Sequence, residues 1–530
     1  MSDAHSSGSN RGVGTTLAPG RLGAAAVTFF ALAATAPIAV LINVVPAAYA
    51  TGGGPLVPLS FLAVGVVLIF FSAGYAAMAN RAPFAGAMYT YVARGLGRPA
   101  GVGAAWLALA CYQAIQLGLY GMAGVAAAPL LASWFGVTAS WWMVAAGCWL
   151  LVTLAGTIRA EVVSGLIALL VLAEVAVAVG FTAANVIDPA PGGLTRATIV
   201  PTGDVDMTTL GLLLVVGLLA FAGFETTGAY AEESIRPRRD PGLSTYGVVA
   251  ALAVLIGVAS WSLNAATGAD RITEVARARG SELLFDLAAG RLAPWAVTIG
   301  RLMLLTGLFA AVLALHHAMA RYLYALGRER VLPAALGRTS PRTLAPRTAA
   351  LTQSAVVAVL LAAAAWAGVG DPPTVGRRLM IAGALGLLLV LLATSVAALL
   401  HLNRVPNGEG VYTRFVAPVL SIVALGSLGY LAFRDPGALV GVRESLWILP
   451  LTLAAVIALG VLHALILRGT RPVIYAGIGQ GGAPVVVTPK APLDEHGTGR
   501  AIPRPRAAEA PQEPQEPREP GAHRPERVNR

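Results

Sequence analysis

The sequence predicts an all-α polytopic membrane protein with about twelve transmembrane helices. The first observation is composition: the 530 residues are 56% hydrophobic and only 12% charged, whereas a soluble chain of this length needs more charge to cover its surface. The second is that the apolar residues fall in blocks about as long as the 20 helical residues that cross a hydrocarbon core. The third is that these blocks end at Gly, Pro or Arg.

One membrane domain, residues 21–470, is predicted between two polar ends. A flexible arm (1–20) precedes it, and a tail (471–530) rich in Pro, Glu, Arg and Gln follows it and is predicted to be disordered. The first apolar run is too long for a signal-peptide core, so no cleavage is expected. The predicted spans are 24–50, 55–79, 101–133, 141–157, 161–186, 208–232, 244–267, 293–320, 348–368, 378–402, 414–433 and 445–467.

The positive charges predict the orientation of the chain. The net charge is +11, and Lys490 is the only lysine among the 37 basic residues. The arginines gather mainly in alternate loops, and such loops stay in the cytoplasm, so both termini are predicted to be cytoplasmic. This distribution follows membrane topology, and no nucleic-acid partner is expected.

The sequence offers no sign of an enzyme. It contains no nucleotide-binding glycine loop joined to a strand, no His/Cys metal cluster and no serine elbow. Cys111 and Cys148 fall inside predicted spans, where they are better interpreted as small apolar residues than as a disulfide or a metal pair. We therefore expect no cofactor and no metal.

Two predicted spans are interrupted. The first contains Pro37, a helix breaker well inside the membrane, and the sixth combines Gly223 with the charged Glu225. Because five spans separate the two starting points, the breaks occupy matching positions of two blocks, a pattern typical of a binding site between inverted repeats. The alternative is a packing kink, since Pro and Gly are common in membrane helices. The two breaks together favour a site made of Ala33, Ala34, Thr35, Ala36, Pro37, Phe221, Ala222, Gly223 and Phe224.

Four motifs carry a resemblance to a known family. They are Phe221-Ala-Gly-Phe-Glu225 with Tyr230-Ala-Glu-Glu-Ser234 and Pro237-Arg-Arg239; Ala320-Arg-Tyr-Leu-Tyr-Ala-Leu-Gly-Arg328 with Val331-Leu-Pro333; Gly86-Ala-Met-Tyr89 with Gly95-Leu-Gly97; and Pro37 with Val45-Pro46 and Gly52. In this order and spacing they make residues 24–475 similar to the amino acid–polyamine–organocation permeases.

The resemblance implies a LeuT-type fold of two inverted five-helix repeats plus two further helices. It also implies a secondary active transporter that carries amino acids or related organic amines across the cytoplasmic membrane. The driving force would be a proton gradient or exchange. In this family the small-molecule substrate lies between the broken first and sixth helices.

The residues at the breaks suit an amino acid. A half-helix that begins near Thr35–Pro37 presents free N–H groups and a positive dipole end to a carboxylate. Carbonyl groups left unpaired near Ala33, Phe221 and Ala222 can accept from an ammonium group. Small side chains let a ligand approach the backbone, and two aromatic rings, Phe221 and Phe224, can close over it and offer a π-face to the cation.

Two carboxylates are predicted deep in the membrane, where a charge is costly and indicates function by default. For Glu225 the resemblance points to gating or to sensing of protonation, and the alternative is a structural hydrogen bond to a neighbouring helix. Glu174 also matches a recurrent family position, with function and structure equally weighted. Glu232 and Glu233, near Arg238 and Arg239, are predicted to form surface ion pairs that fix a loop.

The chain departs from the family at two points. Many proton-coupled relatives carry a cation early in helix five, where residues 162–166 have none, so simple proton symport is an open question. His317, beside His316, replaces an Asn common in helix eight, and it is either a proton relay or a packed neutral ring, with packing slightly favoured. Thr306 is a candidate hydroxyl ligand, and Tyr112 is a candidate hydroxyl over the site or a packing residue.

Two other functions stay open. A polyamine carrier of the same fold would need a more acidic pocket than Glu225 and Glu174 provide. A transport-inactive membrane sensor would signal through its tail, which contains no recognisable domain.

Overall fold

The computed structural model describes residues 16–191, 194–195, 198–200, 206–434 and 447–482. Within these residues the chain is mainly helical, and an isolated β-bridge joins Leu22 to Ser234. All of the described residues belong to one compact unit. The predicted arm up to residue 15 and the predicted tail from 483 onward lie outside the described residues.

Eleven helical segments of the described chain are long and apolar enough to cross a membrane. This confirms an all-α polytopic membrane protein. The α7 helix (Trp141–Gly156) has only 16 residues, fewer than the 20 or so that a crossing usually needs, so the count of twelve stays a prediction. The uninterrupted spans are α4 (Leu56–Arg81), α6 (Arg98–Phe135), α8 (Ala160–Ile187), α10 (Asp240–Thr267), α13 (Pro294–Arg328), α14 (Arg347–Trp366), α15 (Pro372–Arg404), α16 (Ala417–Arg434) and α18 (Ile448–Thr470).

The first broken span consists of four pieces: α1 (Ala24–Thr35), α2 (Pro37–Ala39), the π-helical η1 (Val40–Val44) and α3 (Val45–Ala50). Ala36 separates α1 from α2 with a left-handed φ of 49°. Pro37 explains the break, because it has no N–H with which to continue α1, although it suits the start of a new helix.

The second broken span consists of α9 (Met207–Leu219) and the 3-10 helix η3 (Phe224–Glu233). Gly223 stands between them with a φ of 113°, a value that few residues other than glycine adopt. Both interruptions therefore occur where the sequence predicts them.

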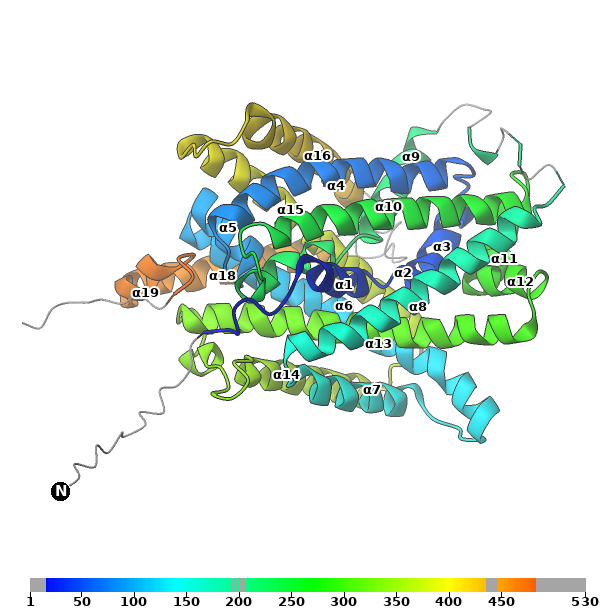
Figure 1. The fold of residues 1–530 in the computed structure, drawn as a ribbon, viewed down its shortest axis with the longest axis horizontal. Helices are drawn as coiled ribbons and strands as arrows, with labels where there is room; N and C mark the ends of the chain where they lie inside the picture. Colours follow the sequence, from blue (N-terminus) through cyan, green and yellow to red (C-terminus); the bar gives the residue numbers. More distant parts are fainter. Residues whose placement is uncertain (1–15, 192–193, 196–197, 201–205, 435–446, 483–530) are drawn as a thin grey trace, which may run out of the picture. The chain divides into compact units, whose positions relative to one another are not determined.

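The helices around the breaks position the candidate site. The α1 helix packs against α8, α10, α13 and η3, and α2 packs against α8 and α13. In Figure 1 the labels α1 and α2 stand among these long helices. The residues at both breaks consequently share one buried hydrophobic cluster.

The two ends of the bundle differ. One end, which we call the arginine-rich end, contains Arg81, Arg94, Arg98, Arg328 and Arg404, together with the short helices α5 (Ala87–Gly95), η5 (Ala334–Gly337) and α19 (Pro472–Gly477). At the far end, α11 (Ile272–Arg279), η4 (Gly280–Glu282) and α12 (Leu283–Ala289) pack together, and α11 contacts α3.

The two largest differences from the predicted boundaries are at the end of α13 and at the start of the tail. The α13 helix continues to Arg328, beyond the predicted end at 320, because Arg321 and Arg328 form ion pairs that let the helix extend past its apolar run. The first twelve residues of the predicted tail, 471–482, have defined structure, including α19. Near the other terminus, Leu17 is buried in a small cluster with Tyr324.

Candidate functional site

The two helix breaks touch through their backbones. A Cβ atom added to Gly223 would lie 2.9 Å from both the carbonyl carbon and the oxygen of Ala34, closer than real Cβ atoms approach other atoms. The positive φ of Gly223 imposes a second requirement for glycine. Any side chain here would therefore push the two breaks apart.

A carboxylate covers the start of the second half-helix. Glu174 of α8 accepts a hydrogen bond from the N–H of Ile38, with 2.6 Å between Oε1 and the nitrogen. Ile38 follows Pro37 at the beginning of α2, where N–H groups have no partner within the helix. Glu174 is only 1% exposed, and among the described residues its other oxygen, Oε2, has no hydrogen-bond partner.

A second carboxylate covers the other break. Glu225 accepts from the N–H of Gly223 at 3.0 Å through Oε2, and from the hydroxyl of Tyr112 on α6 at 2.7 Å through Oε1. The Tyr75 hydroxyl donates to the backbone carbonyl of Glu225 at 2.7 Å. Glu174 and Glu225 therefore each accept from an N–H group of one break, and the sequence alone did not predict this pairing.

The backbone carbonyls at the breaks differ from expectation. The carbonyl of Ala33 accepts from the N–H of Ala36 at 2.9 Å, and that of Phe221 accepts from the N–H of Phe224 at 3.1 Å. The prediction that these carbonyls are unpaired is therefore wrong for Ala33 and Phe221, because the chain closes a tight turn at each break; for Ala222 it stays a prediction. Each carbonyl oxygen keeps a second lone pair for another donor. The hydroxyl of Thr35 is likewise used locally, donating to the Leu32 carbonyl at 2.7 Å.

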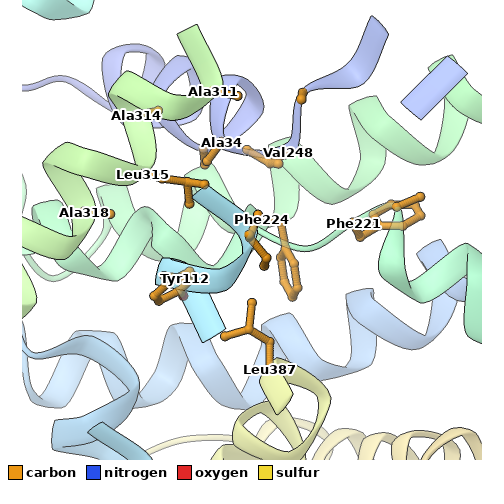
Figure 2. Packing of buried hydrophobic residues seen from close by; sticks show 14 of the residues in the cluster. Ala34, Tyr112, Phe221, Phe224, Val248, Ala311, Ala314, Leu315, Ala318 and Leu387 are labelled. Carbon is orange, nitrogen blue, oxygen red and sulfur yellow. The ribbon is translucent and has the colours of Figure 1, made fainter. Parts of the chain in front are cut away.

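The apolar side chains around the breaks surround Phe224. Figure 2 shows Phe224 near Ala34, with Leu315 and Leu387 nearby. The Phe224 ring packs edge to face on Phe71 at 5.6 Å between ring centres. Phe221 is buried too, but Figure 2 shows it pointing away from Tyr112 and Phe224. The two rings therefore do not form a pair over one space, and Phe224 is the better-placed of the two. Ala36 is buried and Ala222 is half-buried.

Two other candidate residues lie away from the hydrogen bonds at the breaks. The Thr306 hydroxyl donates to the carbonyl of Met303 in its own helix at 3.3 Å. The next residue, Gly307, faces the Glu174 carboxyl group, which a Cβ there would approach to 3.0 Å. His317 belongs to a different cluster, which lies between the breaks and the arginine-rich end.

That cluster, which we call the buried gate, consists of Phe30, Tyr230, Glu233, His317 and Arg321. Arg321 forms an ion pair with Glu233 at 2.5 Å and stands 4.6 Å from the centre of the Tyr230 ring. Nδ1 of His317 lies 3.2 Å from the guanidinium of Arg321, and the Phe30 ring stacks on Tyr230 at 4.6 Å. The members are at most 4% exposed, so together they fill the space between η3, α1 and α13.

Two sequence interpretations need correction here. Glu233 is a buried partner of Arg321, and Glu232 pairs with Arg328 at 2.5 Å, so neither forms the predicted surface pairs with Arg238 and Arg239. The reason is that η3 directs both carboxylates toward α13. Sequence reasoning also missed Arg321 as a functional candidate, although an arginine within an apolar run and inside a family motif is a signal for one.

Comparisons with known proteins agree with this architecture. The model of a family described as amino acid permease matches residues 25–466. An uncharacterized transporter of Mycobacterium tuberculosis is 29% identical over 332 residues, which cover 60% of this chain and 68% of that protein. A branched-chain amino acid permease of Lactococcus lactis is 25% identical over 334 residues, covering 58% of this chain and 68% of that protein. The match over most of the chain shows that this protein belongs to the amino acid permease family.

Proposed function

We propose that this protein is a secondary active transporter of neutral amino acids with apolar side chains, located in the cytoplasmic membrane with both termini in the cytoplasm. The main observation in support is that a backbone N–H at each helix break donates to a carboxylate. The N–H of Ile38 donates to Glu174, and the N–H of Gly223 donates to Glu225. N–H groups that already bind a carboxylate of the protein are suited to bind that of an amino acid.

The hydrogen bond between Ile38 and Glu174 supports a coupling mechanism. A substrate carboxylate and the Glu174 carboxylate compete for the N–H of Ile38, because both are strong acceptors when ionised. Two negative charges beside one N–H group also repel each other. A proton on Glu174 weakens its hold on Ile38 and removes the repulsion. Proton binding would thus favour substrate binding, which is the requirement for proton-driven uptake, while exchange needs only that one substrate replace another.

The substrate's ammonium group and side chain have separate partners. The remaining lone pairs on the carbonyls of Ala33 and Phe221 suit the ammonium group. Buried apolar residues such as Phe224, Leu315 and Leu387 suit an aliphatic side chain. The name of the similar branched-chain amino acid permease supports the same substrate class.

The alternatives fit these contacts less well. A polyamine needs carboxylates without other partners, whereas Glu225 accepts hydrogen bonds with both oxygens and Glu174 with one. A transport-inactive sensor would bind the amino acid without moving it.

Reconstitution into proteoliposomes tests the proposal. Labelled leucine, lysine and putrescine are supplied with and without an inward proton gradient, and exchange is measured in vesicles preloaded with leucine. We expect leucine to enter fastest. Preference for putrescine would favour the polyamine carrier, and saturable binding of leucine without uptake or exchange would favour the sensor.

A pair of variants on one helix tests the coupling mechanism. Glu174→Gln should retain exchange of leucine but lose its stimulation by the proton gradient, because the amide does not take up a proton. Glu161→Gln, at the start of the same helix and with a partly exposed side chain, should keep the stimulation. If Glu174→Gln responds to the gradient as the unaltered protein does, Glu174 is not the coupling group.

A further inference from the structure

The residues that follow the last membrane span return to the arginine-rich end and dock there. Glycine-rich residues 477–482 begin at the last residue of α19. The N–H of Gly479 donates to Glu329 at 2.9 Å, and the N–H of Gly481 donates to the same carboxyl group at 2.7 Å. Glu329 is 1% exposed and immediately follows α13. One buried carboxyl group therefore holds this segment through two backbone contacts.

The docked segment also binds α5, and the preceding α19 binds α6. Arg94 of α5 donates to the carbonyl of Gly479 at 3.0 Å, and Arg98 of α6 donates to that of Ala476 in α19 at 3.1 Å. The hydroxyl of Tyr89 on α5 contacts both Glu329 and the N–H of Gly479. The segment thus connects the end of α13 to α5, two elements far apart in the sequence.

Glycine is required at two of the docked positions. Gly479 and Gly481 have φ values of 77° and 76°, which favour glycine. A Cβ on Gly481 would lie 2.3 Å from the ring of Phe84, and a Cβ on Gly479 would lie 2.9 Å from Ala93. Gly482 differs, because a Cβ there would meet nothing within 4 Å.

The docking is mainly polar, which suits a contact that can be released. Ile478, 2% exposed, is its buried apolar anchor. A cavity of about 500 Å³ adjoins the segment and is lined by Arg94, Arg98, His401, Tyr475 and Ile478, among others. Water that enters this cavity can replace the hydrogen bonds to the arginines as the segment leaves.

The docked segment lies beside the helices that close the arginine-rich end. Arg328, the residue before Glu329, pairs with Glu232 of η3, and Glu232 also accepts from the N–H of Ala85 before α5. About two helical turns closer to the site, Arg321 and Glu233 connect α13 to η3 in the buried gate. Separation of η3 from α13 would break both ion pairs and uncover the buried gate, and the docked segment restrains the end of α13.

We propose that residues 477–482 form a removable clamp, which holds α13 against α5 and keeps the arginine-rich end closed until the segment undocks. The clamp rests on the proposed function, because opening and closing at this end is a step of transport. Its test does not need a known substrate, so failure of the clamp and failure of the transport proposal are distinguishable.

The test measures the accessibility of single cysteines in the full chain. Cys111 and Cys148 are first changed to Ser. Ala318→Cys, on α13 between the breaks and Glu329, reports opening at the arginine-rich end, since Ala318 is 0% exposed. Val40→Cys, on the other side of the Pro37 break and 7% exposed, reports the far side. The protein is held in lipid nanodiscs, and labelling by a soluble maleimide is followed with time.

The clamp is released by Gly481→Val, and Gly482→Val is the matched control. We expect Gly481→Val to raise the labelling rate of Ala318→Cys by about tenfold or more, as expected for the loss of at least one hydrogen bond to the Glu329 carboxyl group. Labelling of Val40→Cys should not rise, and Gly482→Val should behave as the unaltered chain. A chain truncated after Gly477 provides a second release variant that introduces no clash.

Two results would refute the clamp. If truncation and Gly481→Val both leave Ala318→Cys labelling unchanged, the docked segment does not control this end. If the labelling rates of Ala318→Cys and Val40→Cys rise equally, the variants loosen the whole protein. That result would also refute the clamp.

Discussion

The ion pair in the buried gate allows a quantitative test of how the arginine-rich end is held. Arg321 and Glu233 lie 2.5 Å apart with side chains 2% and 6% exposed. Removing one partner leaves an uncompensated buried charge, which costs about 3–5 kcal/mol. Arg321→Met also loses the contact with the Tyr230 ring, worth about 0.5–2 kcal/mol. It should therefore lower the free energy of unfolding more than Glu233→Gln does.

The double variant distinguishes a buried pair from two independent residues. Because no unpaired charge remains, it should be destabilised by much less than the sum of the single variants. The assay is reversible unfolding in mixed detergent micelles, followed by tryptophan fluorescence.

An exposed ion pair between another arginine of α13 and η4 supplies the control for this cycle. Arg301 lies 2.5 Å from Glu282 and 4.5 Å from the centre of the Phe285 ring, but its side chain is 40% exposed. Arg301→Met should cost only about 0–1 kcal/mol. Two results would refute this reasoning. One is that the losses of unfolding free energy in Arg321→Met and Glu233→Gln add up in the double variant; the other is that Arg321→Met loses no more unfolding free energy than Arg301→Met.

Three further predictions concern the site and the clamp. Gly223→Leu should abolish stabilisation by leucine in a thermal-shift assay, because its side chain would separate the two breaks, whereas Gly165→Leu, with nothing within 4 Å, should not; unchanged affinity in the former would place the site elsewhere. Glu225→Gln should flatten the pH profile of uptake while binding persists, and a profile like that of the unaltered protein would make Glu225 structural. Burial raises the pKa of Glu329 from 4.5 to about 7, so docking is strongest at acid pH and weakens as the pH rises through 7; the labelling rate of Ile478→Cys, divided at each pH by its rate in the denatured chain to correct for thiolate formation, should increase from pH 5.5 to 8, and Glu329→Gln should remove this increase in the ratio.

The sign of the Glu329 prediction follows from the groups that face this carboxyl group. They are the hydroxyl of Tyr89, the backbone N–H groups of Gly479, Gln480 and Gly481, and the neighbouring Arg328, which already pairs with Glu232. The hydrogen bonds from the backbone lower the pKa, but burial is the larger effect. The docked carboxyl group therefore holds a proton more tightly than an exposed one, and loss of that proton favours undocking.

The sequence predicted the features that depend on local chemistry. Pro37 cannot continue a helix, and Gly223 can adopt a positive φ, so both breaks were predictable from residue type. The apolar runs located most spans to within a few residues, because the thickness of the hydrocarbon core sets their length.

The sequence did not predict which distant groups meet. That Glu174 accepts from Ile38, 136 residues away, depends on the packing of α8 against α2. Likewise, the glycines at 477–482 follow a composition shift typical of a disordered tail, and only their contacts with Glu329 distinguish them from it. Pairings of this kind require the three-dimensional arrangement, since neither partner carries a local signal for the other.

The contact between Gly223 and Ala34 has a consequence for changing what the protein recognises. It involves a glycine and backbone atoms, so the meeting of the breaks does not depend on the identity of the larger side chains around them. Residues such as Leu315 and Leu387 can therefore be exchanged for others of similar volume while the backbone geometry is kept. An engineer seeking a permease for a different amino acid would vary these surrounding positions and leave the two small residues as they are.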